Sequence, residues 1–281
     1  MRRVMRVKTI KNSLVLSILT LSLTAAAAVA QPSADRIAQE MINKYEESLS
    51  QIETLSMTIQ VNEGGLIPDM TTRYVKKTNE NGTPYLDLEN GDAMEMDFSA
   101  LAGSVDQMVD LIRGAESITE EKVNGMDTYK IYVNDSELLK SLDQSEMEME
   151  DMEIVFDAAT IWIEISTMNV RKIFMEQTVD GDKNMSMEMS LDDYQVFSGY
   201  PVPMSMTMKI GGMSSQFSAE EIAEAREAMR EMEKQLSQMP EAQRQAIERQ
   251  IKPQMEQFEQ MLESGEGMTM NIAVTNVIVN E

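Results

Sequence analysis

The sequence predicts an α+β fold in which one antiparallel sheet is preceded by a helix and interrupted by a long helical segment. Apolar and polar residues alternate over many short segments, as in strands that bury one face. Short turns rich in Gly, Asn and Asp join these segments, which favours antiparallel neighbours. Residues 218–264 are charged, helix-favouring and nearly free of β-branched side chains. Together these features predict a sheet with a helical insertion before its last strand.

The first thirty residues have the pattern of a secretory signal peptide. Five basic residues precede an apolar stretch at Leu14–Leu23, and Ala28-Val29-Ala30 supplies the small residues that a signal peptidase requires. The alternative is a membrane anchor, which needs about 20 apolar residues, but this stretch breaks up into Ser, Thr and Ala. We therefore expect residues 1–30 to be cleaved before Gln31 and the mature chain to act in the periplasm.

Charge and composition exclude several classes of protein. The chain has 24 basic and 48 acidic residues, and loss of the signal peptide would leave 19 basic residues and a net charge of −29. Nucleic acid is not an expected partner, because phosphate binding requires a basic surface. The sequence has no Cys, so we expect neither a lipid-anchored cysteine nor disulfides. Residues 31–281 are long enough to form one domain with a sizeable core.

The elements after the signal peptide follow from residue spacing. Ser33 or Asp35 can cap a helix whose apolar face recurs every four residues from Ile37 to Leu49. Leu101–Arg113 is a second amphipathic segment, and Asn124-Gly125 is a tight-turn signal inside a hairpin. Residues 137–149 are polar and ambiguous. The predicted strands are Thr54–Val61, Thr71–Lys77, Pro84–Leu88, Ala93–Phe98, Ser117–Val123, Asp127–Val133, Thr160–Ser166, Arg171–Val179, Asn184–Leu191, Met204–Ile210 and Met268–Val279.

The block 218–264 predicts a helical hairpin. Ser218 and Glu221 form a capping box, and an apolar stripe runs from Ile222 to Met239. Pro240 ends this stripe and suits an early position of a second helix, in which Pro253 would introduce a kink. The two stripes can pack on each other, so we expect the hairpin to be an insertion in the sheet.

The 28 methionines are the most unusual feature of the composition. Several strands place Met at every second position, which puts those side chains on one face of the sheet. Met is flexible and is overused at binding surfaces that adapt to their ligand. We therefore take this methionine face as a candidate wall of a ligand cavity, consisting of Met57, Ile59, Ile163, Met185, Met187, Met189, Met204, Met206, Met208, Met268 and Met270.

Three interpretations of the methionine face remain open at the level of sequence. It can be an ordinary core filled by Met, a surface that holds an acyl chain, or a Cu(I) site, since thioethers select that ion. Copper is disfavoured because side chains two apart on a strand are separated by about 6.6 Å. The sequence also has no His or Cys to complete such a site, and we expect no metal or other cofactor.

Common catalytic arrangements are missing from the sequence. Without His or Cys, a Ser-His-Asp triad, a Cys-His pair and a His-ligated zinc are all impossible. The sequence has no G-x-S-x-G, S-x-x-K or P-loop motif. Paired carboxylates remain conceivable among 48 acids, but a sugar cleft needs aromatic platforms and the chain has one Trp. We expect a protein that is not an enzyme.

The first helix and strand, Trp162-Ile163-Glu164, and the segments 171–177, 191–196 and 199–204 together have a recognisable layout. This layout resembles the periplasmic outer-membrane lipoprotein-sorting family, with its LolA-like fold. It covers most of residues 33–210 and 268–279, whereas the block 218–264 departs from the compact carriers. The resemblance implies a curved antiparallel half-barrel sheet lidded by helices around an apolar cavity for acyl chains. It assigns no role to any single residue.

These inferences predict a non-catalytic periplasmic carrier for acylated ligands, either a lipoprotein or a lipid, held by the methionine face. The alternative is an envelope interaction or stress-sensor module that contacts a partner protein through the hairpin at 218–264. A hydrolase acting on envelope polymers is a third class. The sequence names neither the ligand nor the partner.

Overall fold

The computed structural model describes residues 32–61, 69–79, 82–89, 105–140, 154–181, 183–212, 219–241, 244 and 267–281. The chain divides into two units, and the fold below is that of the second, Ala34–Glu281. The predicted signal peptide lies outside the described residues. So do the predicted strand Ala93–Phe98 and, except for residues 240, 241 and 244, the predicted second helix of the hairpin.

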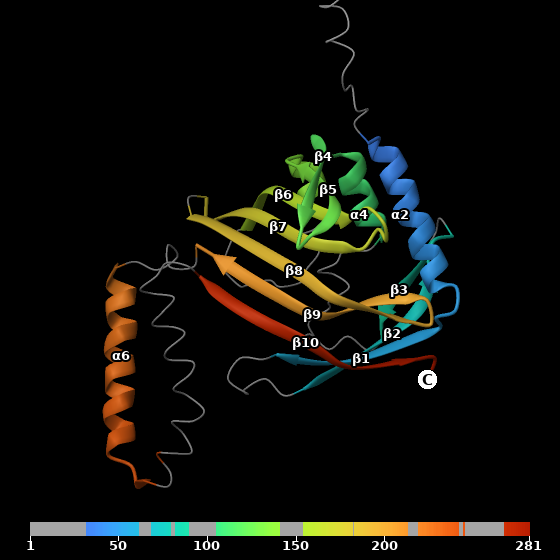
Figure 1. Cartoon of the computed structure of the whole chain (residues 1–281). Helices are drawn as coiled ribbons and strands as arrows, with labels where there is room; N and C mark the ends of the chain where they lie inside the picture. Colours follow the sequence, from blue (N-terminus) through green and yellow to red (C-terminus); the bar gives the residue numbers. More distant parts are fainter. Residues whose placement is uncertain are drawn as a thin grey trace, which may run out of the picture. The chain divides into compact units, whose positions relative to one another are not determined.

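The fold is built on one open antiparallel sheet of ten strands (Figure 1). Their order is β3-β2-β1-β10-β9-β8-β7-β6-β5-β4, so the last strand of the chain lies between β1 and β9. The predicted α+β class with an antiparallel sheet is therefore confirmed. The strands are β1 (Thr54–Val61), β2 (Met70–Thr78), β3 (Pro84–Leu88), β4 (Ser117–Val123), β5 (Met126–Val133), β6 (Ile154–Glu164), β7 (Val170–Val179), β8 (Lys183–Phe197), β9 (Tyr200–Gly211) and β10 (Met268–Val279).

Three of the described helices pack against the sheet or against one another. Helix α2 (Ala34–Leu49) lies beside α4 (Val105–Arg113), as Figure 1 shows, and α5 (Ser136–Lys140) contacts β6. The buried face of α2 includes Ile37 and Met41, as its spacing predicts, and α4 buries Met108 and Ile112. These side chains join the inner face of the sheet in one main core. None of the described helices has a stretch long and apolar enough to span a membrane.

The strands extend beyond their predicted ends where prolines sit in the sheet. The predicted strand Met204–Ile210 begins after Pro201 and Pro203, yet both prolines lie in β9 and pair with β8. Proline can occupy a strand whose other edge needs no hydrogen bond. The pairing of β9 with β10 begins only at Ser205, so the proline segment has a partner on one side alone. The sheet tolerates these prolines for that reason.

The segment between β9 and β10 leaves and re-enters the sheet at neighbouring positions. Ile210 and Met268 are paired across the two strands. Gly267, with φ 81°, lies so close to β9 that a Cβ atom there would be 1.8 Å from the Ile210 carbonyl oxygen. Helix α6 (Ala219–Ser237) occupies the first half of the predicted hairpin. The ends of the insertion therefore meet at adjacent strands.

This geometry predicts that residues 218–264 can be removed. Replacing them with a short Gly-Ser linker should leave the sheet folded, because β9 and β10 would become a simple hairpin with the same register. Circular dichroism and a thermal melt of the deletion variant provide the measurement. Loss of the strand signal or of the cooperative transition would show that the insertion belongs to the core, which contradicts the prediction.

Candidate ligand cavity

A cavity of about 1010 Å³ lies between the helices and the inner face of the sheet. Helices α2 and α4 contribute Met41 and Met108, and β1 contributes Leu55. The turn before β7 and the hairpin between β8 and β9 contribute further side chains, Met168 and Tyr200 among them. This volume is at the upper end of the range of about 300–1,000 Å³ for ligand pockets. A long flexible ligand is thus within its capacity.

The register of the strands aligns the methionines in rows across the inner face. Met189 on β8 pairs with Met208 on β9, which pairs with Met270 on β10. Directly paired residues of antiparallel strands share a face. Met187, Ile210 and Met268 form the next row. The methionines of β8, β9 and β10 therefore lie on one face of the sheet.

The cavity touches only part of this methionine face. Met57, Ile59 and Met206 line it. Ile163 and Met189 are buried in the main core, and Met208 is buried on β9. The partly buried candidates outside the lining of this cavity are Met185, Met187, Met204, Met268 and Met270. Contact of the methionine face with a ligand stays a prediction.

Tyrosines form a second group of lining residues. Tyr45 from α2, Tyr74 from β2, and Tyr194 and Tyr200 beside the β8–β9 hairpin all line the cavity. Burial raises the pKa of Tyr45 to about 12, despite an opposing backbone hydrogen bond at Leu86. Burial also raises the pKa of Tyr194 and of Tyr200. These three phenols are therefore neutral near physiological pH, and they add hydroxyl groups to the cavity wall.

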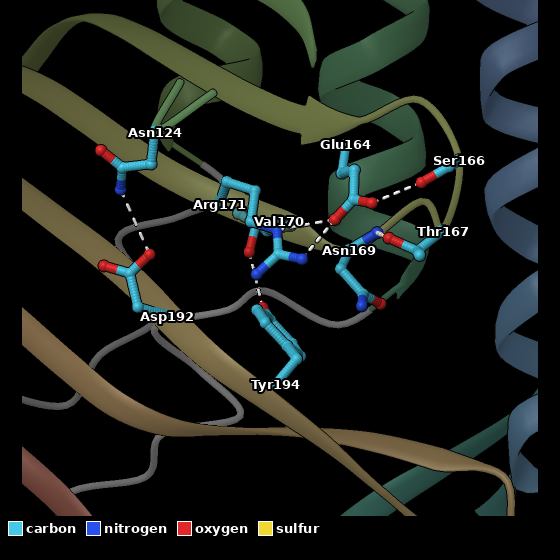
Figure 2. Close-up of polar contacts among 9 residues, drawn as sticks. All are labelled: Asn124, Glu164, Ser166, Thr167, Asn169, Val170, Arg171, Asp192 and Tyr194. Carbon is cyan, nitrogen blue, oxygen red and sulfur yellow. Dashed lines mark hydrogen bonds and ion pairs between the residues drawn. The ribbon is translucent and has the colours of Figure 1, made fainter. Parts of the chain in front are cut away.

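An ion pair with little exposure joins the end of β6 to the start of β7 (Figure 2). The Glu164 and Arg171 side chains are 12% and 10% exposed, and Arg171 Nε donates to Glu164 Oε2 at 2.8 Å. Ser166 Oγ donates to the same carboxylate. Burial alone would raise the pKa of Glu164, but the hydrogen bonds from Ser166 and Arg171 and the charge of Arg171 outweigh it and lower the pKa. The carboxylate is thus ionised.

The same ion pair fixes Tyr194 in the cavity wall. The Arg171 guanidinium lies over the Tyr194 ring, 4.5 Å from its centroid, which is within the range of a cation–π contact. The Tyr194 hydroxyl donates to the Val170 carbonyl oxygen at 2.6 Å. Val170 and the preceding turn, residues 166–169, also line the cavity. The ion pair therefore positions both the ring and the turn.

The turn before β7 contains a backbone conformation that is rare for a large side chain. Met168 has φ 61° and is only 5% exposed. The Met168 amide donates to the Glu164 carbonyl oxygen at 2.9 Å, and the Glu164 amide donates to the Asn169 carbonyl oxygen at 2.9 Å. These bonds hold the left-handed residue, which otherwise costs on the order of 1–3 kcal/mol. The turn thereby directs a thioether side chain to the cavity.

Sequence reasoning assigned no role to Glu164, Arg171 or the tyrosines of the cavity wall. Glu164 follows a largely apolar run, Ala158–Ile163, at the end of β6, and that contrast was the available signal. The tyrosines carried no such signal because they come from distant segments. Among the described residues, no group of three His, Cys, Asp or Glu side chains is placed to hold a metal ion. The arrangement can enclose an apolar ligand and offer it neutral hydrogen-bonding groups.

Comparison with known proteins gives similarity at the level of structure. No family model and no curated protein sequence matches the chain. A domain provisionally assigned to outer membrane lipoprotein sorting, from Vibrio parahaemolyticus, is 9% identical with a TM-score of 0.38, and covers 88% of this chain and 92% of its own. A DUF1329 family protein from Desulfovibrio piger is 10% identical with a TM-score of 0.40, and the match covers 89% of this chain and 94% of that protein.

A LolA superfamily protein from Nitrosomonas europaea is 10% identical with a TM-score of 0.33, covering 87% of this chain and 94% of its own. The structures to which this chain is similar thus include the family that its sequence resembles. At these identities and TM-scores the likeness gives no basis for assigning a ligand. The function has to be argued from the cavity.

Proposed function

We propose that the protein is an exported, non-catalytic binding or carrier protein for an acylated ligand, either a lipoprotein or a lipid. The observation that carries the proposal is the cavity between α2, α4 and the inner face of the sheet. Its size suits a long chain, and its lining is mainly aliphatic side chains, thioethers and neutral phenols. The resemblance of the sequence to the lipoprotein-sorting family favours the same ligand class.

The energetics of such a cavity suit a carrier. Burial of an acyl chain provides about 0.8 kcal/mol per CH₂ group, which exceeds the cost of association for a long chain. Met41, Met57, Met108 and Met206 line different sides of the cavity and can adopt new rotamers around different chains. A protein that releases its ligand to an acceptor needs this adaptability, together with an affinity that is not extreme.

A pair of matched variants tests the position of the ligand. Met57 and Met187 are both partly buried on the inner face, but only Met57 lines the cavity. Met57→Trp should weaken binding of a fluorescent fatty acid about tenfold, since an occupied cavity loses several CH₂ contacts. Met187→Trp should leave binding unchanged, and both variants should keep a cooperative melt. Fluorescence titration of the mature protein provides the measurement.

The two variants also distinguish a ligand held in the cavity from a ligand held along the whole methionine face, which the sequence predicts. Equal losses from both substitutions would place the acyl chain along the whole methionine face, including Met185, Met189, Met204, Met208, Met268 and Met270. If the unmodified protein binds neither the fluorescent fatty acid nor an uncharged acyl ester, the carrier function is contradicted in either form.

An interaction or sensor module is the second candidate, because α6 and the turn that follows it expose apolar side chains. Met232 and Met239 are 41% and 37% exposed, whereas the described face of the sheet buries its methionines in part or fully. A partner protein could cover such side chains. The test compares the full chain with the variant lacking 218–264. If only the full chain forms a stable complex with an envelope protein, while both bind acyl ligands equally, the insertion carries the function.

A further inference from the structure

We propose that the cavity selects acyl chains carried on an uncharged ester, amide or hydroxyl head, and disfavours fatty acids and other anionic lipids. This inference rests on the proposed function, and it names the ligand's head rather than its chain. It follows from the charges that line the cavity and from the groups with which they are paired.

The cavity wall contains few charges, and all are in ion pairs. Among the lining residues that the structure describes, Lys44 is the one with a positive charge, and Glu47 and Asp87 are the acidic ones. Lys44 Nζ lies 3.7 Å from Glu47 Oε2 on the same helix. Asp87 is paired with Lys77, which does not line the cavity. The lining residues therefore carry a net charge of −1 and offer no cation without an acidic partner.

Nearby cations are also engaged. Lys76 Nζ lies 2.7 Å from Glu53 Oε1 and donates to the Leu49 carbonyl oxygen at 3.4 Å. Arg171 is bound to Glu164 and stacked on Tyr194. A carboxylate or phosphate that entered the cavity would compete with a protein carboxylate for each of these cations. The net charge of −24 on the whole chain adds repulsion at longer range.

The remaining polar lining consists of neutral groups. Most of the hydroxyl and amide side chains lie in the turn before β7 and at the end of α2 with its following turn, while Gln107 comes from α4 and Ser198 from the turn between β8 and β9. Hydroxyls and amides form hydrogen bonds with esters, amides and alcohols without a charge. A cationic head is not favoured either, because Glu47 and Asp87 already have partners. These neutral residues are Ser48, Ser50, Gln51, Gln107, Ser166, Thr167, Asn169 and Ser198.

A displacement series with one acyl chain and three heads tests the proposal. The mature protein is saturated with the uncharged probe N-phenylnaphthylamine at low salt. Monopalmitoylglycerol, palmitate and palmitoylcholine then compete, each below the concentration at which it forms micelles. We expect monopalmitoylglycerol to displace the probe at about one-fifth of the concentration that palmitate needs, the ratio being limited by solvent screening at these exposed charges. Palmitoylcholine should also be weaker than the glycerol ester.

Two variants test whether the lining charges cause the preference. Glu47→Gln with Asp87→Asn changes the lining charge from −1 to +1 and should bring palmitate close to monopalmitoylglycerol. Lys44→Gln changes it in the other direction and should weaken palmitate further. Glu116→Gln with Glu120→Gln is the matched control, because it removes two exposed acids near the edge strand β4. It should leave the ranking of the heads unchanged.

The outcomes distinguish this inference from the proposed function. Failure of every competitor to displace the probe overturns both. Displacement by all three heads at equal concentration, or best by palmitate or palmitoylcholine, overturns the head selectivity alone. A ranking that the lining variants leave unchanged overturns its assignment to these charges. A diacylglyceryl-cysteine peptide added to the series supports a lipoprotein anchor if it binds more tightly than the monoacylglycerol, and a membrane lipid if it does not.

Discussion

Replacing Arg171 with methionine should lower the free energy of unfolding by about 3 kcal/mol, because the nearly buried Glu164 carboxylate would lose its cation. The substitution also removes the guanidinium from the Tyr194 ring. Urea unfolding at neutral pH provides the measurement. The turn at residues 166–169 should loosen as well, so acyl binding should weaken together with stability.

The control is an ion pair on the surface. Lys122 and Asp127 are 2.7 Å apart with side chains 64% and 70% exposed, and exposed pairs contribute about 0–1 kcal/mol. Lys122→Met should therefore have a small effect. If both variants lose the same free energy of unfolding, the pair of Glu164 and Arg171 is solvated as well as the exposed pair of Lys122 and Asp127. Adding Glu164→Leu to Arg171→Met should restore part of the stability, since no charge is then left buried.

The pH dependence of the same pair has a definite sign. The pKa of Glu164 is lowered in the folded protein, so its contribution is present above the unfolded pKa of about 4.3 and is lost as pH falls through the folded value. The unmodified protein should therefore lose more stability on acidification than Arg171→Met does. A difference between the two that stays constant down to acidic pH would contradict the role of the carboxylate.

Alkaline pH should unfold the protein through its buried tyrosines. The pKa of Tyr45 is raised to about 12 by burial, against about 10 in an unfolded chain. The contribution of the neutral Tyr45 phenol to the free energy of unfolding is complete below pH of about 10. It is lost as pH rises toward 12, because the phenol releases its proton at lower pH in the unfolded state. This change amounts to on the order of 3 kcal/mol for Tyr45, and Tyr194 and Tyr200 act in the same direction.

Tyrosinate absorbance and circular dichroism, followed together with rising pH, provide the measurement. The buried phenols should ionise in the same transition in which the strand signal disappears. Tyr200→Phe removes one titrating group, so the transition should move to higher pH while stability near neutral pH changes little. Ionisation of all tyrosines well before unfolding would show that the cavity admits water and hydroxide freely, which argues against an apolar binding site.

The sequence by itself determined the class of the fold and most of its elements. Strand β10 begins and ends where the alternation from Met268 to Val279 predicts, and the hairpin at Asn124-Gly125 joins β4 to β5. These are local features, in which side-chain period and turn chemistry act within a few residues. The same period placed the methionines of β8, β9 and β10 on one face before any tertiary contact was known.

Only the tertiary structure decided which side chains line the cavity together. Met57 and Met206 line it while Met187 does not, although all three have the same spacing in their strands. The difference depends on where α2 and α4 cover the sheet, and no local pattern encodes this. Tyr45, Tyr74 and Tyr200 meet because β10 inserts between β1 and β9 and brings the two halves of the chain together. Contacts between such distant segments depend on strand order, which alternation within a single strand does not specify.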